Sequence, residues 1–176
     1  FAGGVNNTTY YIRWNTYWDR IYKDLMAPAN QVIKIADEGN YTVFSAWAKL
    51  IKIMGVSRLT TYHGPVIYSN YGSTESTIKY DSEADLYNTF FTQLDEIQAV
   101  FAANKTYAGM KKFDASYSGD VTKWMKLVNS LRLRLAIRIS KAAPALAKTQ
   151  GEKAIADAAG LITSNSDNMT ISLYGG

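Results

Sequence analysis

Four side chains able to bind a sugar lie close together in the sequence: Tyr62, His63, Tyr68 and Tyr71. A tyrosine ring offers a flat face that stacks on the C–H-lined face of a sugar, and its hydroxyl can bond sugar oxygens. Tyrosine also loses little conformational entropy when it is fixed, because it has only two side-chain torsions. We therefore take these residues as candidate ligand-binding residues. The alternative is that the tyrosines pack their loop onto neighbouring helices.

A second candidate segment precedes the first expected helix and reads N-N-T-T-Y at residues 6–10. Asn7 can donate and accept hydrogen bonds through one amide, which suits the neighbouring hydroxyls of a sugar. Tyr10 adds an aromatic ring beside it. We include Asn7 and Tyr10 among the candidate ligand-binding residues. The alternative is a frayed helix cap.

The residues needed for common catalytic and metal sites are scarce. The chain has no cysteine and one histidine, which excludes thiol catalysis and zinc–thiolate centres and leaves little for a histidine-based triad. Asp81, Glu83 and Asp85 could resemble the paired acids of a glycosidase, but acids at the start of a helix are favoured by the helix dipole. The sequence predicts a binding protein rather than an enzyme, with no metal and no cofactor.

The net charge of +4 does not by itself indicate a nucleic-acid partner. The basic residues between 123 and 141 spread around their expected helix instead of forming one stripe, so we predict no nucleic-acid binding. Arg134 and Arg138, four residues apart, are predicted to be structural and to pair with carboxylates or helix-end carbonyls. The four tryptophans lie on apolar helix faces and are predicted to be core residues: Trp14, Trp18, Trp47 and Trp124.

Helical spacing of apolar residues positions these candidates. It predicts helices over 10–37, with a kink or break at Pro28, and over 42–58, 83–103, 120–143 and 145–162. Long loops are expected at 62–82 and 104–118. Short links between helices favour antiparallel neighbours. We predict a single all-α domain over residues 1–176, built from antiparallel helix pairs. No apolar run approaches the roughly 20 residues of a membrane span, and we interpret the sequence as an interior piece of a longer exported protein.

Three stretches resemble the SusD/RagB family of nutrient-binding outer-membrane lipoproteins. Residues 118–124 read S-G-D-V-T-K-W, and residues 129–138 read N-S-L-R-L-R-L-A-I-R, where the family has Gly-Asp, Lys-Trp and then Asn-Ser-Leu-x-x-Arg-Leu-Ala-x-Arg. Residues 62–68 read Y-H-G-P-V-I-Y, where the family usually has Tyr-Gly-Asp-Val-Pro-Tyr. The third stretch is Y-D at 80–81, followed by L-Y at 86–87 and L-D at 94–95.

The resemblance implies a helical part of a longer SusD-like chain, with a degenerate tetratricopeptide-like, right-handed superhelix. It implies a lipid-anchored protein on the outer face of a Gram-negative outer membrane, with the anchor outside this sequence. Such a protein would capture a glycan, or in some relatives peptides, and pass it to a SusC-like TonB-dependent transporter. In some relatives the segment before the first long helix also contributes ligand contacts. The alternative function is a tetratricopeptide-like domain that binds proteins or peptides without binding sugar.

Overall fold

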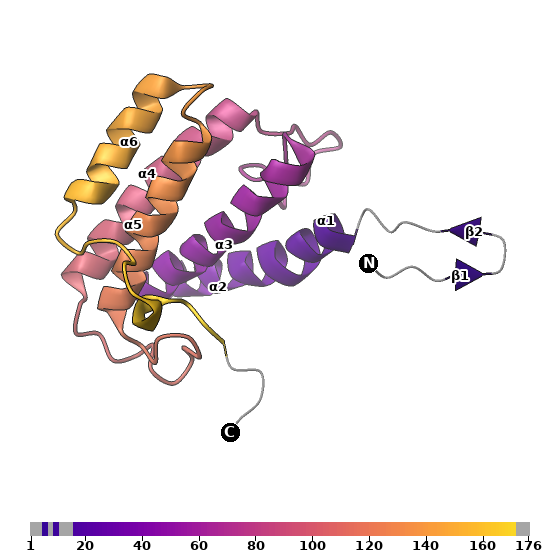
Figure 1. Cartoon of the computed structure of the whole chain (residues 1–176). Coiled ribbons are helices and arrows are strands. Elements are labelled where there is room, and N and C mark those ends of the chain that lie inside the picture. Colours follow the sequence, from indigo (N-terminus) through magenta and orange to yellow (C-terminus); the bar gives the residue numbers. More distant parts are fainter. Residues whose placement is uncertain (1–4, 7–8, 11–15, 172–176) are drawn as a thin grey trace.

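The computed structural model describes residues 5–6, 9–10 and 16–171 (Figure 1). Two short antiparallel strands, β1 (Val5–Asn6) and β2 (Thr9–Tyr10), precede the helices. The helical elements are α1 (Thr16–Arg20), the π-helical η1 (Ile21–Met26), α2 (Ala27–Glu38), α3 (Thr42–His63), α4 (Glu83–Ala103), α5 (Val121–Arg138), α6 (Pro144–Ala156) and the 3₁₀ turn η2 (Asn165–Asp167). Residues 9–10 are thus paired as a strand, and the prediction that a helix begins at Tyr10 is wrong.

Consecutive long helices pack against each other and run in alternating directions from α2 to α6 (Figure 1). The all-α prediction with antiparallel helix pairs is confirmed. The core lies where α3, α4 and α5 meet. Its largest fully buried apolar side chains are Trp124, Phe90, Phe101, Met26, Leu50, Ile53, Leu59, Leu86, Leu94, Ile97 and Met110.

The first helical segment continues through Pro28 without a break. Pro28 lies in the first turn of α2, directly after the π-helical stretch, and the Ala27 N–H donates to the carbonyl of Tyr22, five residues earlier. A wider turn at this point accommodates a residue that has no N–H to donate. The predicted kink or break is therefore replaced by a short π-helical segment.

Helix α3 continues beyond its predicted end at residue 58. It ends at His63 because Gly64 adopts a φ of 72°, in the region that favours glycine, and the Thr60 hydroxyl donates to the Gly64 carbonyl at 2.6 Å. The first long loop accordingly begins at residue 64 instead of 62. Two later helices are shorter than predicted, since α5 ends at Arg138 and α6 at Ala156.

The loop between α4 and α5 is organised around one buried carboxylate. Asp114 accepts hydrogen bonds from the backbone N–H groups of Ser116, Tyr117 and Gly119 at 2.9–3.0 Å, and from the Trp124 indole N–H at 2.7 Å. Gly119 has a φ of 83°, and a Cβ at this position would come within 2.7 Å of the Lys111 backbone. The G-D pair of the 118–124 motif therefore has a structural reason, because Asp120 then caps α5.

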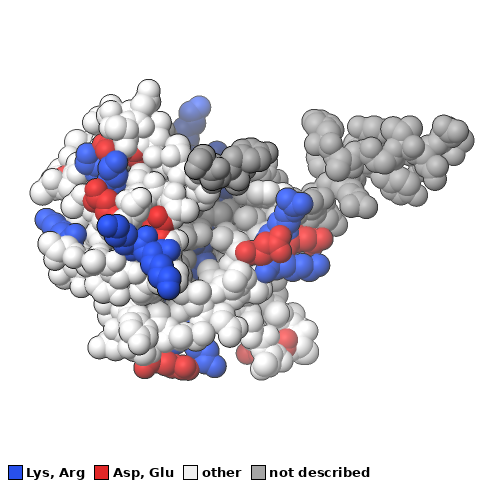
Figure 2. All heavy atoms as spheres, turned by 90° about the horizontal axis from the view of Figure 1, so that it is seen from below, with Lys and Arg blue, Asp and Glu red and all other residues white. Residues whose placement is uncertain are grey.

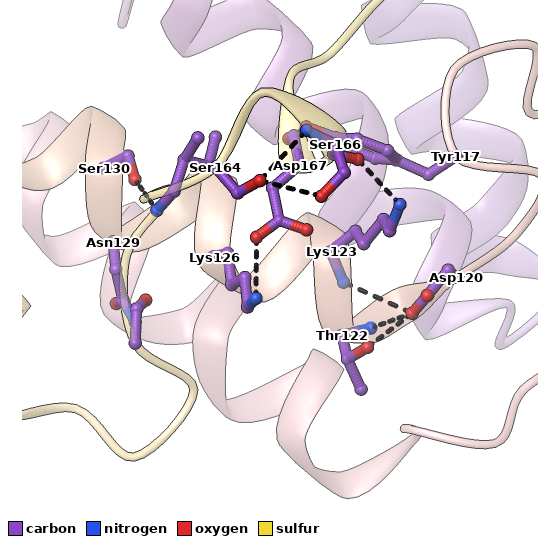
Figure 3. Close-up of polar contacts among 12 residues, drawn as sticks. Tyr117, Asp120, Thr122, Lys123, Lys126, Asn129, Ser130, Ser164, Ser166 and Asp167 are labelled. Atoms are coloured by element: carbon purple, nitrogen blue, oxygen red, sulfur yellow. Dashed lines mark hydrogen bonds and ion pairs between the residues drawn. The ribbon is translucent and has the colours of Figure 1, made fainter.

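The segment after α6 is held against α5 by polar contacts (Figure 3). Lys126 pairs with the Asp167 carboxylate at 2.8 Å, Lys123 donates to the Ser166 carbonyl at 2.9 Å, and Tyr117 donates to the Asp167 carbonyl at 2.8 Å. These contacts fix the course of residues 157–171 across α5 and beside the 104–118 loop.

Candidate functional site

Aromatic side chains gather where the C-terminal end of α3 meets α1, η1 and the 64–82 loop. We call this group the aromatic face. Its members are Tyr17, Trp18, Tyr22, Tyr62, His63, Tyr71 and Tyr80. Three stretches that are distant in the sequence supply them, so only the folded chain brings the group together.

Trp18 lies at the centre of the aromatic face. Its ring centre is 5.0 Å from that of Tyr22, 5.1 Å from His63 in an edge-on arrangement, and 6.2 Å from Tyr80. Trp18 is half-buried, His63 is exposed, and the Tyr80 side chain is 57 % exposed. The Trp18 ring is thus partly covered, and its exposed neighbours His63 and Tyr80 offer flat ring surfaces on which a sugar can stack.

Tyr62 extends the aromatic face toward α1. It is 62 % exposed, and its ring meets Tyr17 edge-on at 5.8 Å. The Arg58 guanidinium lies 5.9 Å from the centre of the Tyr17 ring, and a hydrogen bond with Tyr62 raises the pKa of Arg58. This edge of the face therefore combines an open ring with a permanent cation, and the Tyr62 hydroxyl and the guanidinium can both bind the oxygens of a ligand.

The 64–82 loop is fixed beneath the aromatic face by hydrogen bonds to its neighbours. The Asp81 carboxylate accepts from the backbone N–H groups of Tyr68 at 2.7 Å and Ser69 at 3.0 Å. The Tyr22 hydroxyl accepts from the Ile67 N–H at 2.9 Å, and burial raises the pKa of Tyr22 to about 12, so its hydroxyl stays neutral. A loop held this way presents its side chains with little ordering cost.

Tyr68 and Tyr71 serve mainly to pack this loop. Tyr68 is only 4 % exposed, lies edge-on to Phe90 at 5.3 Å and donates its hydroxyl hydrogen to Gln93. This burial favours the packing alternative for Tyr68. Tyr71 is half-buried, stacks on Tyr22 at 5.5 Å and donates to the Tyr22 carbonyl at 3.0 Å.

The remaining candidates lie away from the aromatic face or outside the described residues. Asn7 is outside them, and of Tyr10 only the backbone, in β2, is described. Trp124 is 1 % exposed and packs edge-on against Trp47 at 5.4 Å, so its core position is confirmed. Trp18, in contrast, is not a fully buried core residue.

The two arginines predicted to be structural are both exposed. Arg138 lies beside Tyr87, and Arg134 lines a surface hollow next to Ile162. The buried arginine of α5 is Arg132, which is 1 % exposed and pairs with Asp95 at 2.6 Å. A structural role for Arg134 and Arg138 stays a prediction.

The part of the chain that the structure describes contains neither a metal site nor a membrane-spanning helix. Over residues 16–171 no group of three or more acidic or histidine side chains is placed to hold a metal ion. None of the described helices is both long and apolar enough to cross a membrane. Basic and acidic side chains lie next to one another among much uncharged surface on the face shown in Figure 2.

Comparison with known proteins shows the family to which the sequence motifs belong. A family model described as SusD-like, "Susd and RagB outer membrane lipoprotein", matches residues 1–175. This chain belongs to the SusD-like family. No curated protein matches the chain.

Solved SusD homologues share both sequence and fold with this SusD-like chain. A SusD homologue from Bacteroides uniformis is 41 % identical with a TM-score of 0.82, over 89 % of this chain and 32 % of its own. A chitin-binding SusD homologue from Flavobacterium johnsoniae is 39 % identical with a TM-score of 0.83, over 96 % of this chain and 36 % of its own. A further structure, titled a chitin-binding protein, is 38 % identical with a TM-score of 0.77, over 88 % of this chain and 33 % of its own. The chain therefore spans about a third of the length of these relatives.

Sequence reasoning identified part of the aromatic face and missed its centre. Tyr62 and His63 were candidates and lie on it, whereas Trp18 and Tyr80 were not. Trp18 follows the apolar spacing of a helix, which predicts a core residue. Tyr80 could have been included from the sequence, because it is an aromatic residue directly before Asp81, which fixes the loop.

Proposed function

We propose that this SusD-like chain carries part of a glycan-binding site and that the aromatic face is that part. The observation that carries the proposal is the group of Trp18, Tyr62, His63 and Tyr80, which is open to solvent and held on a fixed scaffold. Two similar structures, at 39 % and 38 % identity, are described as chitin-binding. Oligosaccharides of N-acetylglucosamine are therefore the first ligand class to test.

The physical basis is stacking supported by polar contacts. Trp18 and Tyr80 have ring centres 6.2 Å apart and planes at 30° to each other, close enough for one bound oligosaccharide to contact both. Tyr62, His63 and Arg58 supply hydrogen-bonding groups at its edge. An open, wet site of this kind binds with modest affinity, because ordering a flexible sugar offsets much of the gain. Modest affinity suits a protein that must release its ligand.

The cellular role follows from the family. We propose that the whole protein is a lipid-anchored component of the outer membrane that passes captured glycan to a SusC-like TonB-dependent transporter. The matching family is described as outer membrane lipoproteins, which supports this location. We expect binding without catalysis, because the aromatic face brings no pair of carboxylates together.

Calorimetry with the full-length protein tests the site. Chitin oligosaccharides and a panel of other glycans are titrated into the wild type and into Trp18→Ala, Tyr62→Ala and Tyr80→Ala. Loss of a central aromatic contact should weaken binding by about tenfold or more for Trp18→Ala, and by less for the two peripheral tyrosines. Tyr62 and Tyr80 are more than half exposed, so their truncation leaves the fold intact.

Ile155→Ala is the control. Ile155 is 64 % exposed, but lies on α6 and away from the aromatic face. Glycan binding that survives all three variants would move the site to another part of the protein. Binding of peptides with no glycan bound would favour the alternative, a helical domain that binds proteins or peptides.

A further inference from the structure

Arg58 places a positive charge directly at the edge of the aromatic face. It lies on α3, one helical turn before Tyr62, and its side chain is exposed. Its guanidinium lies 5.9 Å from the centre of the Tyr17 ring and is hydrogen-bonded to Tyr62. Tyrosines from two elements, α1 and α3, therefore orient this charge. A planar guanidinium that is already oriented loses less side-chain entropy when it binds a further partner.

This guanidinium has no carboxylate partner in the part of the chain that the structure describes. The ion pairs found there use other basic residues, which are Lys34, Lys126, Arg132, Lys148 and Lys153. The neighbours that shift the pKa of Arg58 are Tyr17 and Tyr62, and no described carboxylate is among them. Asp81, the acid of the loop beneath the aromatic face, already accepts two backbone N–H groups of that loop. The charge of Arg58 is thus available to a ligand.

A carboxylate is the ligand group that matches such a guanidinium best. Arginine has five N–H donors in a fixed fork, and two of them can bind both oxygens of one carboxylate in parallel. A sugar hydroxyl accepts a single hydrogen bond and brings no opposite charge. Uronic acids carry a carboxylate directly on the sugar ring, so one sugar unit can lie on an aromatic ring while its neighbour reaches the guanidinium.

We propose that the aromatic face selects an acidic glycan and that Arg58 binds a carboxylate of one of its uronic acid units. Trp18 and Tyr80 contact the rings of neighbouring units. This inference rests on the proposed glycan-binding function and narrows its ligand class. It retains the N-acetylglucosamine units suggested above, because a polymer can alternate them with uronic acids.

Calorimetry on the full-length protein with hyaluronan oligosaccharides tests the inference, since these alternate N-acetylglucosamine with glucuronic acid. The matched ligand is the same oligosaccharide after its carboxyl groups have been reduced to primary alcohols, which keeps every linkage and removes the charge. Wild type is compared with Arg58→Gln and with Arg58→Lys, which keeps the charge but loses the paired donors. Arg134→Gln is the control, because Arg134 is exposed on α5, which contributes nothing to the aromatic face.

Wild type should bind the acidic oligosaccharide about threefold to tenfold more tightly than the reduced one at low salt. This preference should disappear in Arg58→Gln, persist in part in Arg58→Lys and stay unchanged in Arg134→Gln. It should also shrink as salt is added, because both charges are exposed to solvent. Equal binding of the acidic and reduced forms by wild type, or a preference that survives in Arg58→Gln, would overturn the inference.

The same titrations separate failure of this inference from failure of the proposed function. If wild type binds chitin oligosaccharides and both hyaluronan forms equally well, and Trp18→Ala weakens all three, the selection of an acidic glycan is wrong and the sugar site stands. If the preference for the acidic form persists in Trp18→Ala and Tyr80→Ala with no loss of affinity, the acidic glycan binds elsewhere and both ideas are wrong.

Discussion

Burial decides which tyrosines can bind a ligand, and neighbouring tyrosines differ sharply in it. Tyr62, at the end of α3, is 62 % exposed, whereas Tyr68, in the loop that follows, is 4 % exposed. The loop folds back after Gly64 and carries Tyr68 against Phe90. The composition of the stretch could not separate the two roles, because the burial of Tyr68 depends on its contact with Phe90 of α4.

Lys52 is an unusual charge in the core. It is 9 % exposed, its amine donates to the side-chain Oδ1 of Asn30 at 2.6 Å, and it lies 4.8 Å from the centre of the Tyr68 ring. Burial, together with the positive charge of Lys49, lowers the pKa of Lys52 to about 8. A buried amine without a carboxylate partner destabilises the folded state while it carries a proton.

We predict that Lys52→Met stabilises the protein at pH 7 and that this advantage shrinks by pH 9.5. The folded state releases the Lys52 proton near pH 8, whereas the unfolded state keeps it up to the ordinary pKa of 10.5. The unfolded state therefore binds more protons between these values, and the free energy of unfolding rises with pH across this window. Thermal unfolding midpoints of both proteins at the two pH values measure the effect. Equal differences at both pH values would contradict it.

Helix starts could be predicted from the sequence more accurately than helix ends. Ser82 and Asp120 accept hydrogen bonds from the first-turn N–H groups of α4 and α5, and both starts lie where the capping residues predict. The end of α3 was missed by several residues, because it depends on the Thr60–Gly64 contact rather than on a break in the apolar pattern. The spacing of apolar residues did not predict the π-helical segment before Pro28.

The candidate site was predicted in part for the same reason. Tyr62 and His63 lie on the aromatic face as the last residues of α3, whereas Tyr68 in the loop is buried and Tyr71 is half-buried. Trp18 was assigned to the core because it continues an apolar helical stripe. Trp18 does pack against the core, but it is only partly buried there. How far a helix face is buried depends on how the helices pack against one another.

The 104–118 loop gives a prediction at the scale of an element. Asp114→Ala removes the acceptor for three backbone N–H groups and the Trp124 indole, so we expect a loss of about 2–4 kcal/mol in unfolding free energy. Urea unfolding followed by tryptophan fluorescence measures this loss. Asp85→Ala, at the exposed start of α4, is a control that should cost about 1 kcal/mol or less. Equal losses in the two variants would contradict the central role of Asp114.

Acid should weaken the same loop. Burial acts to raise the pKa of Asp114, but the hydrogen bonds from Tyr117, Trp124, Gly119 and Ser116 outweigh it and hold this pKa below its ordinary value of 3.8. The stabilisation is therefore fully present above about pH 4 and is lost as the pH falls through the lowered folded pKa. In wild type, unfolding free energy should fall more steeply below pH 4 than in Asp114→Ala.

At the scale of the whole molecule, two surfaces with different chemistry divide the helical scaffold. The aromatic face combines rings with polar groups, whereas the groove between α2, α3 and the 104–118 loop is almost purely apolar. Both use the first helical segment, the aromatic face through Trp18 and Tyr22 and the groove through Leu25 and Val32. A glycan bound to the aromatic face should therefore suppress local opening at one end of this segment and not along all of it.

Hydrogen exchange of the full-length protein with and without a glycan that binds in calorimetry tests this division. We predict slower exchange on binding at residues 16–26 and 58–82, because ligand contacts with Trp18, Tyr62 and Tyr80 suppress local opening there. Peptides from α5 and α6 should show no change, since these helices contribute nothing to the aromatic face. Protection centred on residues 27–38 and 104–118 would instead place the glycan in the groove. That result would contradict a sugar site on the aromatic face.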